Sequence, residues 1–569
     1  MTMQDLPNIP HWPAGVPRTL APARTPLWAN LETSARRHPD RAALVFLGRE
    51  FRYGELWQAV LSLAGRLHRL GVRQGDRVLL DMQNCPQLVI AHFAILRANA
   101  VVVPINPMNK AQELRHFIAD AQAKLAFTTA DLAAEMVRAS DALPPGEGLD
   151  HLVVTRFTDA FDPAAVPPHE WPVAWREWLT APHPMPALRQ GQVHDWADAA
   201  SGDEAPAPTC AAGDLAALPY TSGTTGHPKG CMLSHAAIMH NAMAVKAWNG
   251  LVPESVNLAV VPMFHITGMV GVMHAAIHAG ACSVLMPRWD REVAAHLLSA
   301  RGVTHWANIP TMVIDLMSAS AWERLDLSRL AYIGGGGAAM PKAVAQRLLE
   351  KTGLRYVEAY GLTETAAPSH SNPPDAARQQ CLGLPYIGVD ARVIDPQTLQ
   401  PLGPEQDGEI VVRGPQVFAG YWRQPEATRA AFVEIEGLRF FRTGDIGRVD
   451  ADGYFFMTDR LKRMINASGF KVWPAEVEAL MYRHPGIQEA CVIATRDSYR
   501  GESVKAVVVR RLGHAELDER ALIDWCRANM ASYKVPRAFE FAETLPKSGS
   551  GKVMWRLLQE RQDAADAAC

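Results

Sequence analysis

The sequence has little net charge. Its 56 lysine and arginine residues nearly balance 59 aspartate and glutamate residues, and the formal charge is −3. Such a balance provides no overall field that would attract nucleic acid or an anionic membrane. Any site for an anion must therefore be local and made by a few residues.

Cysteines and long apolar runs are also scarce. The eight cysteines in 569 residues include no Cys-x-x-Cys pair and no spacing typical of metal ligands, so a reduced cytoplasmic location is expected. Residues 1–10 lack the basic start and apolar core of a signal peptide. No stretch reaches the ~20 apolar residues that span a bilayer. The longest candidate, residues 269–286, is interrupted by His274 and His278 and predicts a buried helix running into a strand. Peripheral membrane contact stays open.

Apolar runs alternate with helical patterns through the first part of the chain. Strands are predicted at 77–80, 100–104 and 125–129, and helices at 86–98 and 111–123. Strand-helix-strand alternation is typical of an α/β fold with parallel sheets, and the length predicts several structural units. Residues 157–212 are rich in Pro, Ala, His and Trp and predict an irregular excursion, partly ordered by its tryptophans.

The alternation resumes with strands predicted at 258–261, 282–286, 305–309, 330–334 and 355–360. Ligands of open α/β sheets lie at the carboxyl ends of strands, so the motifs that follow these strands should share one cleft. Residues 408–414 and 447–457 predict antiparallel strands of a small β-barrel. A new pattern, with a helix at 476–484 and strands at 487–494 and 504–509, begins after Asp459. We therefore expect an N-terminal domain over 1–459, a hinge at 460–462 and a small mobile α+β domain over 463–569.

The segment Tyr-Thr-Ser-Gly-Thr-Thr-Gly-His-Pro-Lys-Gly at residues 220–230 has the composition of a phosphate-binding loop. Its glycines let the backbone approach an anion, its hydroxyl groups donate hydrogen bonds, and its lysine supplies positive charge. The spacing does not fit a Walker loop. The predicted phosphate-binding residues are Thr221, Ser222, Gly223, Thr224, Thr225, Gly226 and Lys229.

Further motifs follow in order, at residues 262–268, 334–341, 358–364, 442–445, 459–462, 469–471 and 545–552. With the phosphate loop, this set resembles the adenylate-forming superfamily of acyl-CoA synthetases, aryl-CoA ligases, luciferases and peptide-synthetase adenylation domains. The resemblance covers most of the chain. It implies an ATP-dependent ligase that activates a carboxylic acid as an acyl adenylate and then transfers it to coenzyme A.

The same resemblance implies the ATP site. Glu364, with Thr224, would hold Mg²⁺ against the phosphates, since Mg²⁺ needs only one or two carboxylates besides phosphate oxygens and water. Asp445 would bind the ribose, and Arg460 would lie near the ribose and phosphates. Tyr360 would stack on adenine. The other implied ATP contacts are Gly337, Ala338, Glu358, Ala359, Gly361, Thr363 and Lys552. Glu358 stands where glutamine is common in the superfamily.

Four residues are expected to act in catalysis. Lys552 follows two loop glycines and would bridge the substrate carboxylate and the α-phosphate, as its counterpart does in the superfamily. The others are Lys229, Glu364 and His265. Lys462 occupies the hinge position. The segment that would flank the pantetheine arm of CoA contains Ser468, Gly469, Phe470 and Lys471.

The sequence indicates less clearly which carboxylic acid is the substrate. By resemblance to the superfamily, His265 matches the gate of the acyl site, where members that adenylate amino acids carry an aspartate, so the resemblance disfavours an amino acid. Acetate-activating members of the superfamily restrict their pocket with a tryptophan after the Thr-Glu pair, and because none follows Thr363 and Glu364, the resemblance implies a larger pocket. Its expected lining is His265, Met269, Val272, Trp306, Ile309, Met312, Gly336 and Gly337.

A medium- or long-chain fatty acid is therefore expected, and aryl or arylpropenoic acids are the alternative. Because no carrier domain follows Lys552, free CoA is the expected acceptor. Two other functions stay open: a fatty-acyl-AMP ligase that serves a separate carrier protein, and a non-catalytic sensor of nucleotides or acyl groups. A homodimer also stays open.

Overall fold

The computed structural model describes residues 9–199, 204–221, 228–460, 463–467, 470–472, 474–497, 501–530, 534–547 and 553–568. The chain divides into two compact units. The first contains Met1–Ala391, Val412–Phe441 and Asp452–Phe455, and the second contains Arg392–Val411, Arg442–Ala451 and Phe456–Cys569. Among the described residues, no helix combines the length and apolar character needed to cross a membrane.

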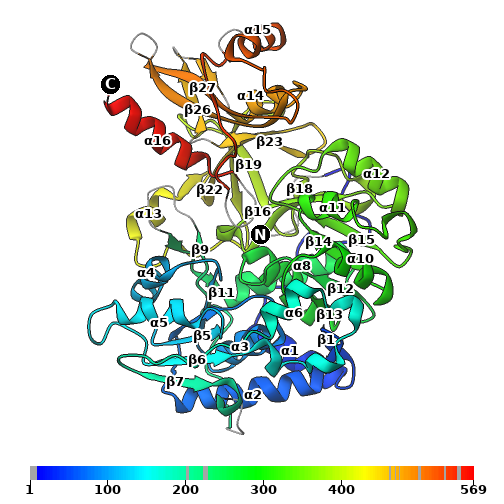
Figure 1. The fold of residues 1–569 in the computed structure, drawn as a ribbon, viewed down its shortest axis with the longest axis vertical. Coiled ribbons are helices and arrows are strands. Elements are labelled where there is room, and N and C mark those ends of the chain that lie inside the picture. Colours follow the sequence, from blue (N-terminus) through cyan, green and yellow to red (C-terminus); the bar gives the residue numbers. More distant parts are fainter. Residues whose placement is uncertain are drawn as a thin grey trace. The chain divides into compact units, whose positions relative to one another are not determined.

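One sheet of the first unit has nine strands, and its central strands run parallel (Figure 1). Its order is β18 (Leu384–Pro385), β17 (Ala367–Ser371), β16 (Val357–Leu362), β15 (Tyr332–Gly335), β14 (His305–Asn308), β12 (Val256–Ala259), β13 (Cys282–Leu285), β1 (Ala42–Phe46) and β2 (Arg49–Arg52). Beyond β16 the sheet turns antiparallel.

The helix that precedes β12 has recognisable start and stop signals. The hydroxyl group of Ser234 accepts a hydrogen bond from the Ala237 amide at 3.1 Å and starts α8 (His235–Asn249), which Gly250 ends with φ 69°. The other helices here are the π-helix η5 (Thr267–His274), α9 (Ala275–Ala279), α10 (Arg291–Ala300), α11 (Pro310–Leu316) and α12 (Lys342–Thr352). The predicted helix-to-strand run at 269–286 is thus η5, α9 and β13.

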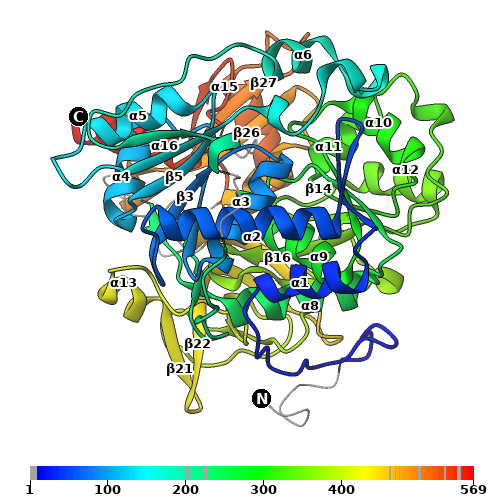
Figure 2. The same ribbon diagram turned by 90° about the horizontal axis from the view of Figure 1, so that it is seen from below.

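A seven-stranded sheet forms the other part of the first unit. Its order is β11 (Leu233–Ser234), β8 (Leu215–Ala217), β4 (Val101–Ile105), β3 (Arg77–Asp81), β5 (Leu125–Thr129), β6 (His151–Thr155) and β7 (Gln192–Asp195). All its pairs are parallel except β11 with β8. The N-terminal helices are α1 (Trp28–Arg37), α2 (Tyr53–Arg69), α3 (Pro86–Arg97), α4 (Ala111–Ala121) and α5 (Ala133–Asp141), and α2 lies beside α3 (Figure 2).

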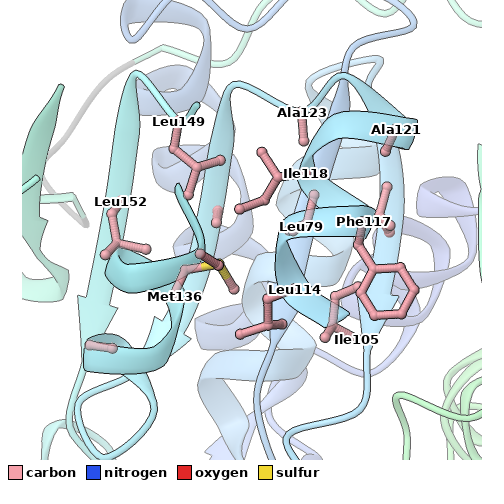
Figure 3. Close-up of a cluster of buried hydrophobic side chains, with 14 of the residues drawn as sticks. Leu79, Ile105, Leu114, Phe117, Ile118, Ala121, Ala123, Met136, Leu149 and Leu152 are labelled. Atoms are coloured by element: carbon pink, nitrogen blue, oxygen red, sulfur yellow. The ribbon is translucent and has the colours of Figure 1, made fainter. Parts of the chain in front are cut away.

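The side chains between this sheet and its helices make a continuous apolar core. From α4, Leu114, Phe117, Ile118 and Ala121 point at the sheet, and this i, i+3, i+4, i+7 spacing is the reason the segment forms an amphipathic helix. They pack with Leu79, Ile105, Met136 and Leu152 (Figure 3). The predicted α/β class with parallel sheets is confirmed.

Residues 157–212 carry more structure than their composition suggests. The segment contains the 3₁₀ turns η2 (Phe157–Asp159), η3 (Pro163–Ala165) and η4 (Pro168–Glu170), then α6 (Val173–Leu179), β7 and α7 (Trp196–Ala199). Strand β7 joins the edge of the seven-stranded sheet in parallel to β6. Trp171, Trp175 and Trp196 are buried. The tryptophans thus order this segment by packing it against the unit.

Two more sheets follow. Where a small barrel was expected, the strands form a five-stranded sheet of β19 (Asp390–Ile394), β20 (Gly408–Arg413), β22 (Leu438–Val449) and β21 (Phe432–Ile435), with β23 (Phe455–Arg460) on β22. Helix α13 (Pro425–Ala430) precedes β21.

The last sheet has the order β25 (Phe470–Val472), β24 (Ile465–Ala467), β27 (Gly501–Arg510) and β26 (Ile487–Asp497), with β28 (Ala538–Phe541) on β27. Helices α14 (Pro474–Met481) and α16 (Trp555–Ala568) lie against β26, and α15 (Glu519–Asn529) precedes β28 (Figure 1). This C-terminal region has its own buried core, so the expected small α+β domain is present.

Candidate active site

The two ends of the predicted phosphate loop face each other across a short hairpin. Strands β9 (Tyr220–Thr221) and β10 (Lys229–Gly230) are antiparallel, and Thr221 pairs directly with Lys229. The phenol of Tyr220 donates to Asp120 Oδ2 at 2.6 Å, which ties the hairpin to α4. Predicted loop residues Ser222, Gly223, Thr224, Thr225 and Gly226 lie outside the described residues.

The strand that leaves this hairpin is held by a segment almost two hundred residues further on. We call residues 418–422 the strap. The Trp422 amide donates to the Gly230 carbonyl at 2.8 Å. The Met232 amide donates to the Gly420 carbonyl at 3.0 Å, and the Ala419 amide donates to the Met232 carbonyl at 2.9 Å. The strap therefore acts as an added strand beside the exit of the phosphate loop.

Glu364 lies in the 3₁₀ turn η7 (Thr363–Thr365), directly after β16, and its side chain is buried. The phenol of Tyr421 donates to Glu364 Oε1 at 2.9 Å, and the Phe418 amide donates to the Glu364 carbonyl at 2.8 Å. Lys229 Nζ lies 5.1 Å from the centroid of the Tyr421 ring. Two predicted site residues, Lys229 and Glu364, thus come together around one tyrosine.

The turn after Glu364 is held by a buried amide on α8. Asn241 Nδ2 donates to the carbonyls of Thr365, Ala366 and Pro368 at 3.0, 2.9 and 3.1 Å. Ala366 has φ 49°, a left-handed conformation that such hydrogen bonds help to maintain. Sequence reasoning missed both Asn241 and Tyr421, because neither belongs to a local motif with the residue that it supports.

Strand β16 positions Glu358, Ala359, Tyr360 and Gly361 in succession. A Cβ atom on Gly361 would lie 2.0 Å from the Ala367 carbonyl oxygen, so the close strand contact requires glycine. The Tyr360 ring is partly exposed and lies 5.6 Å from the ring of His370.

The side chain of Glu358 turns away from solvent and binds two backbone amides. Its Oε1 accepts from the Gln380 amide at 2.6 Å and its Oε2 from the Met340 amide at 3.3 Å. Burial raises the pKa of this carboxyl group to about 7. Glu358 therefore links β16 to the glycine-rich loop and to the loop that contains Gln380.

Two glycines in the loop after β15 differ in how closely their Cα atoms are packed. A Cβ atom on Gly336 would lie 2.3 Å from the Ala359 carbonyl oxygen, so strand packing accounts for this residue. Gly337 has φ 86° and open space where a Cβ atom would be. Next to it, Ala338 is exposed. Gly337 and Ala338 thus present backbone that a ligand could approach.

Among the predicted acyl-pocket residues, Met269 and Val272 lie on η5, Trp306 on β14 and Met312 on α11, while His265 precedes η5 and Ile309 lies between β14 and α11. Met269, Val272 and Trp306 are fully buried, and Ile309 and Met312 are partly buried. His265 is exposed, and its Nδ1 accepts from the Thr267 amide at 3.3 Å. Gly271, on η5, has open space where a Cβ atom would be.

The first unit also contains a cavity of about 280 Å³. It is lined by residues 130–131 after β5, residues 156–158 after β6, and residues 178–183 at the end of α6 and beyond it. None of the predicted acyl-pocket residues lines it.

The remaining predicted residues belong to the second unit. Asp445 is buried, and the Thr443 hydroxyl group accepts from its amide at 3.1 Å. The preceding Arg442 donates to Glu409 Oε2 from Nε and Nη2 at 2.9 and 2.6 Å, which fixes the start of this turn. Arg460, Phe470 and Lys471 have described backbones in β23 and β25. Lys462, Ser468, Gly469 and Lys552 lie outside the described residues.

Among the described residues, no group of three or more His, Cys, Asp or Glu side chains could enclose a metal ion. Magnesium does not need such a group, because substrate phosphates and water supply most of its ligands. The buried carboxylate of Glu364, oriented by a phenol, fits this donor set.

Comparisons with known proteins show the family to which the chain belongs. The family described as "AMP-binding enzyme" matches residues 31–422, and "AMP-binding enzyme C-terminal domain" matches residues 476–552. A long-chain-fatty-acid–CoA ligase of Bacillus subtilis is 33% identical over 564 residues, covering 98% of each chain. A feruloyl-CoA synthase of Amycolatopsis sp is 34% identical over 523 residues, covering 91% of this chain and 96% of the relative.

A solved structure has the same architecture. ATP-bound MatB of Rhodopseudomonas palustris superposes with a TM-score of 0.80 at 28% identity, covering 96% of this chain and 100% of that one. The superfamily expected from the motifs is confirmed, and this chain belongs to the AMP-binding enzyme family.

Proposed function

We propose that this protein is an ATP-dependent carboxylic acid:CoA ligase. The observation that carries the proposal is the meeting of Lys229, from the phosphate-loop hairpin, and Glu364, from the turn after β16, around Tyr421. Activation of a nucleotide requires a cation beside the phosphates and a carboxylate suited to magnesium, and Lys229 and Glu364 supply these two groups.

The first half-reaction forms an acyl adenylate. A carboxylate oxygen of the acid bonds to the α-phosphorus of ATP, and the bond from that phosphorus to the bridging oxygen of pyrophosphate breaks. Lys229 stabilises the departing pyrophosphate, and Lys552 holds the attacking carboxylate beside the α-phosphate. Bound Mg²⁺, held by Glu364 and Thr224, would neutralise phosphate charge.

Other residues position the nucleotide. Asp445 binds the ribose hydroxyl groups, Arg460 contacts the ribose and the phosphates, and Tyr360 stacks on adenine. Gly337 and Ala338 offer bare backbone to the nucleotide. The open space at Gly337 and the partly exposed ring of Tyr360 support these roles.

The second half-reaction forms the thioester. The sulfur of CoA bonds to the acyl carbonyl carbon, the bond to AMP breaks, and the thiol proton passes to solvent. We propose that the C-terminal domain rotates about Lys462 between the two steps, which withdraws Lys552 and presents Gly469 to the pantetheine arm.

A medium- or long-chain fatty acid is the proposed substrate. The Bacillus subtilis relative supports this choice over most of both chains. The feruloyl-CoA synthase keeps an arylpropenoic acid as the second candidate.

The test is to incubate the protein with Mg-ATP, CoA and acids from acetate through long-chain fatty acids to cinnamates, and to measure AMP and thioester by mass. Thioester from fatty acids would support the proposal. Thioester from cinnamates alone would favour the second candidate, and ATP binding without AMP from any acid would contradict ligase activity.

A further inference from the structure

The strap approaches two charged residues of the proposed ATP site, Lys229 and Glu364. Its backbone pairs with residues 230–232 at the exit of the phosphate loop, and the Phe418 amide binds the carbonyl of Glu364. One short segment therefore fixes the backbone on two sides of the site. The residue of the strap whose side chain reaches both charges is Tyr421.

We propose that Tyr421 is a positioning residue, which orients the Glu364 carboxylate through its phenol and supports the Lys229 ammonium group with its ring face. This inference rests on the proposed function. Neither the motifs nor the relatives' names assign a role to this tyrosine.

The phenol has the chemistry to orient a metal-binding carboxylate. Its hydroxyl group donates to Glu364 Oε1 at 2.9 Å, a good length for a hydrogen bond to a charged acceptor. Magnesium demands near-ideal octahedral geometry, so a carboxylate that turns freely would bind it less well.

The ring serves the lysine differently. Lys229 Nζ lies 5.1 Å from the ring centroid, within range of a cation–π interaction. An aromatic face attracts the ammonium group without neutralising its charge, whereas a carboxylate in this position would form an ion pair. The ring contact therefore leaves the ammonium group able to bind a phosphate.

The strap also has anchors that do not involve the Tyr421 side chain. The Trp422 indole donates to the Asp120 carbonyl at 3.0 Å, and Thr428 Oγ1 accepts from the Tyr421 amide at 2.9 Å. Replacing the Tyr421 side chain should consequently leave the path of the strap in place.

Two variants separate the two contacts. Tyr421→Phe removes only the hydroxyl group, and Tyr421→Leu removes the ring as well. The matched control is Tyr53→Phe, which deletes another buried phenol, bonded to the Ala281 carbonyl at 2.7 Å, at the start of α2.

The measurement is calorimetric titration of ATP into each protein over a series of Mg²⁺ concentrations, with Mn²⁺ binding followed by electron paramagnetic resonance. For Tyr421→Phe we expect the metal concentration at half-maximal effect to rise on the order of tenfold, while ATP affinity at saturating metal is retained. For Tyr421→Leu we expect ATP affinity to fall at saturating metal too.

If Tyr421→Phe matches the wild type in metal dependence and loses only thermal stability, as Tyr53→Phe should, the positioning role is wrong. A wild-type protein that binds no nucleotide at any metal concentration would instead overturn the proposed function.

Discussion

Lys229 carries the charge expected to act on the leaving pyrophosphate. Two unit charges ~4 Å apart at an effective dielectric near 20 interact by about 4 kcal/mol, which corresponds to roughly a thousandfold in rate if realised only in the transition state. We expect Lys229→Ala to lower ATP–pyrophosphate exchange by about 100- to 1000-fold. Lys351→Ala, whose ammonium group donates to the Glu323 carbonyl on the surface, is the control. Equal losses in the two variants would contradict a specific role.

Glu358 provides a test that depends on pH. Its pKa is raised from 4.5 to about 7, so between these values the folded protein holds a proton that the unfolded chain has released. The contribution of Glu358 to the free energy of unfolding therefore falls as pH rises through this window. Glu358→Gln does not titrate.

From pH 4.5 to 7 we expect the stability of Glu358→Gln to rise relative to wild type by ~3 kcal/mol. Urea denaturation at a series of pH values measures this difference. A difference that stays constant across the window would show that burial does not raise this pKa.

At the scale of elements, η5 contributes to the proposed acyl pocket, so it offers a test of substrate choice. Gly271 has open space at its Cβ position, while Met269 and Val272 on the same helix are fully buried. We expect Gly271→Leu to fill this space and to lower kcat/KM for long-chain acids at least tenfold more than for short-chain acids. A panel of acids of increasing length measures the effect. A uniform loss across all lengths would mean that the space does not receive the acyl chain.

The sequence predicted individual elements well. The helix expected at 86–98 is α3 (Pro86–Arg97), and the strands expected at 125–129 and 305–309 are β5 and β14. Hydrophobic periodicity and a proline at the first helical turn are local signals, so they can be read without the fold. The π-helical winding of η5 was missed because it has the same apolar composition as an α-helix.

Contacts between distant segments were not predictable in the same way. Tyr421 and Glu364 are 57 residues apart, and Asn241 is more than a hundred residues from the turn that it holds. The motif residues Lys229 and Glu364 were identified, but their supporting residues have no signature of their own. The placement of β7 on the sheet edge likewise depends on packing. The composition of the residues around β7 predicts an irregular segment instead.

At the scale of the whole molecule, the proposed division of labour between half-reactions can be tested through Lys552. We expect Lys552→Ala to reduce acyl-adenylate formation at least a hundredfold and to spare thioester formation from supplied acyl adenylate and CoA. Lys547→Ala, five residues earlier and paired with Glu489, is the control. Similar losses in both half-reactions would contradict alternation about Lys462.

The pairing of residues 230–232 with the strap also has a consequence for biosynthesis. The exit of the phosphate loop is synthesised early, but its partner strand is made almost two hundred residues later. Contacts of such long sequence separation form slowly. During synthesis, this edge of the proposed nucleotide site stays uncovered until residues 418–422 have left the ribosome. A nascent chain released before residue 422 would leave the edge exposed to aggregation.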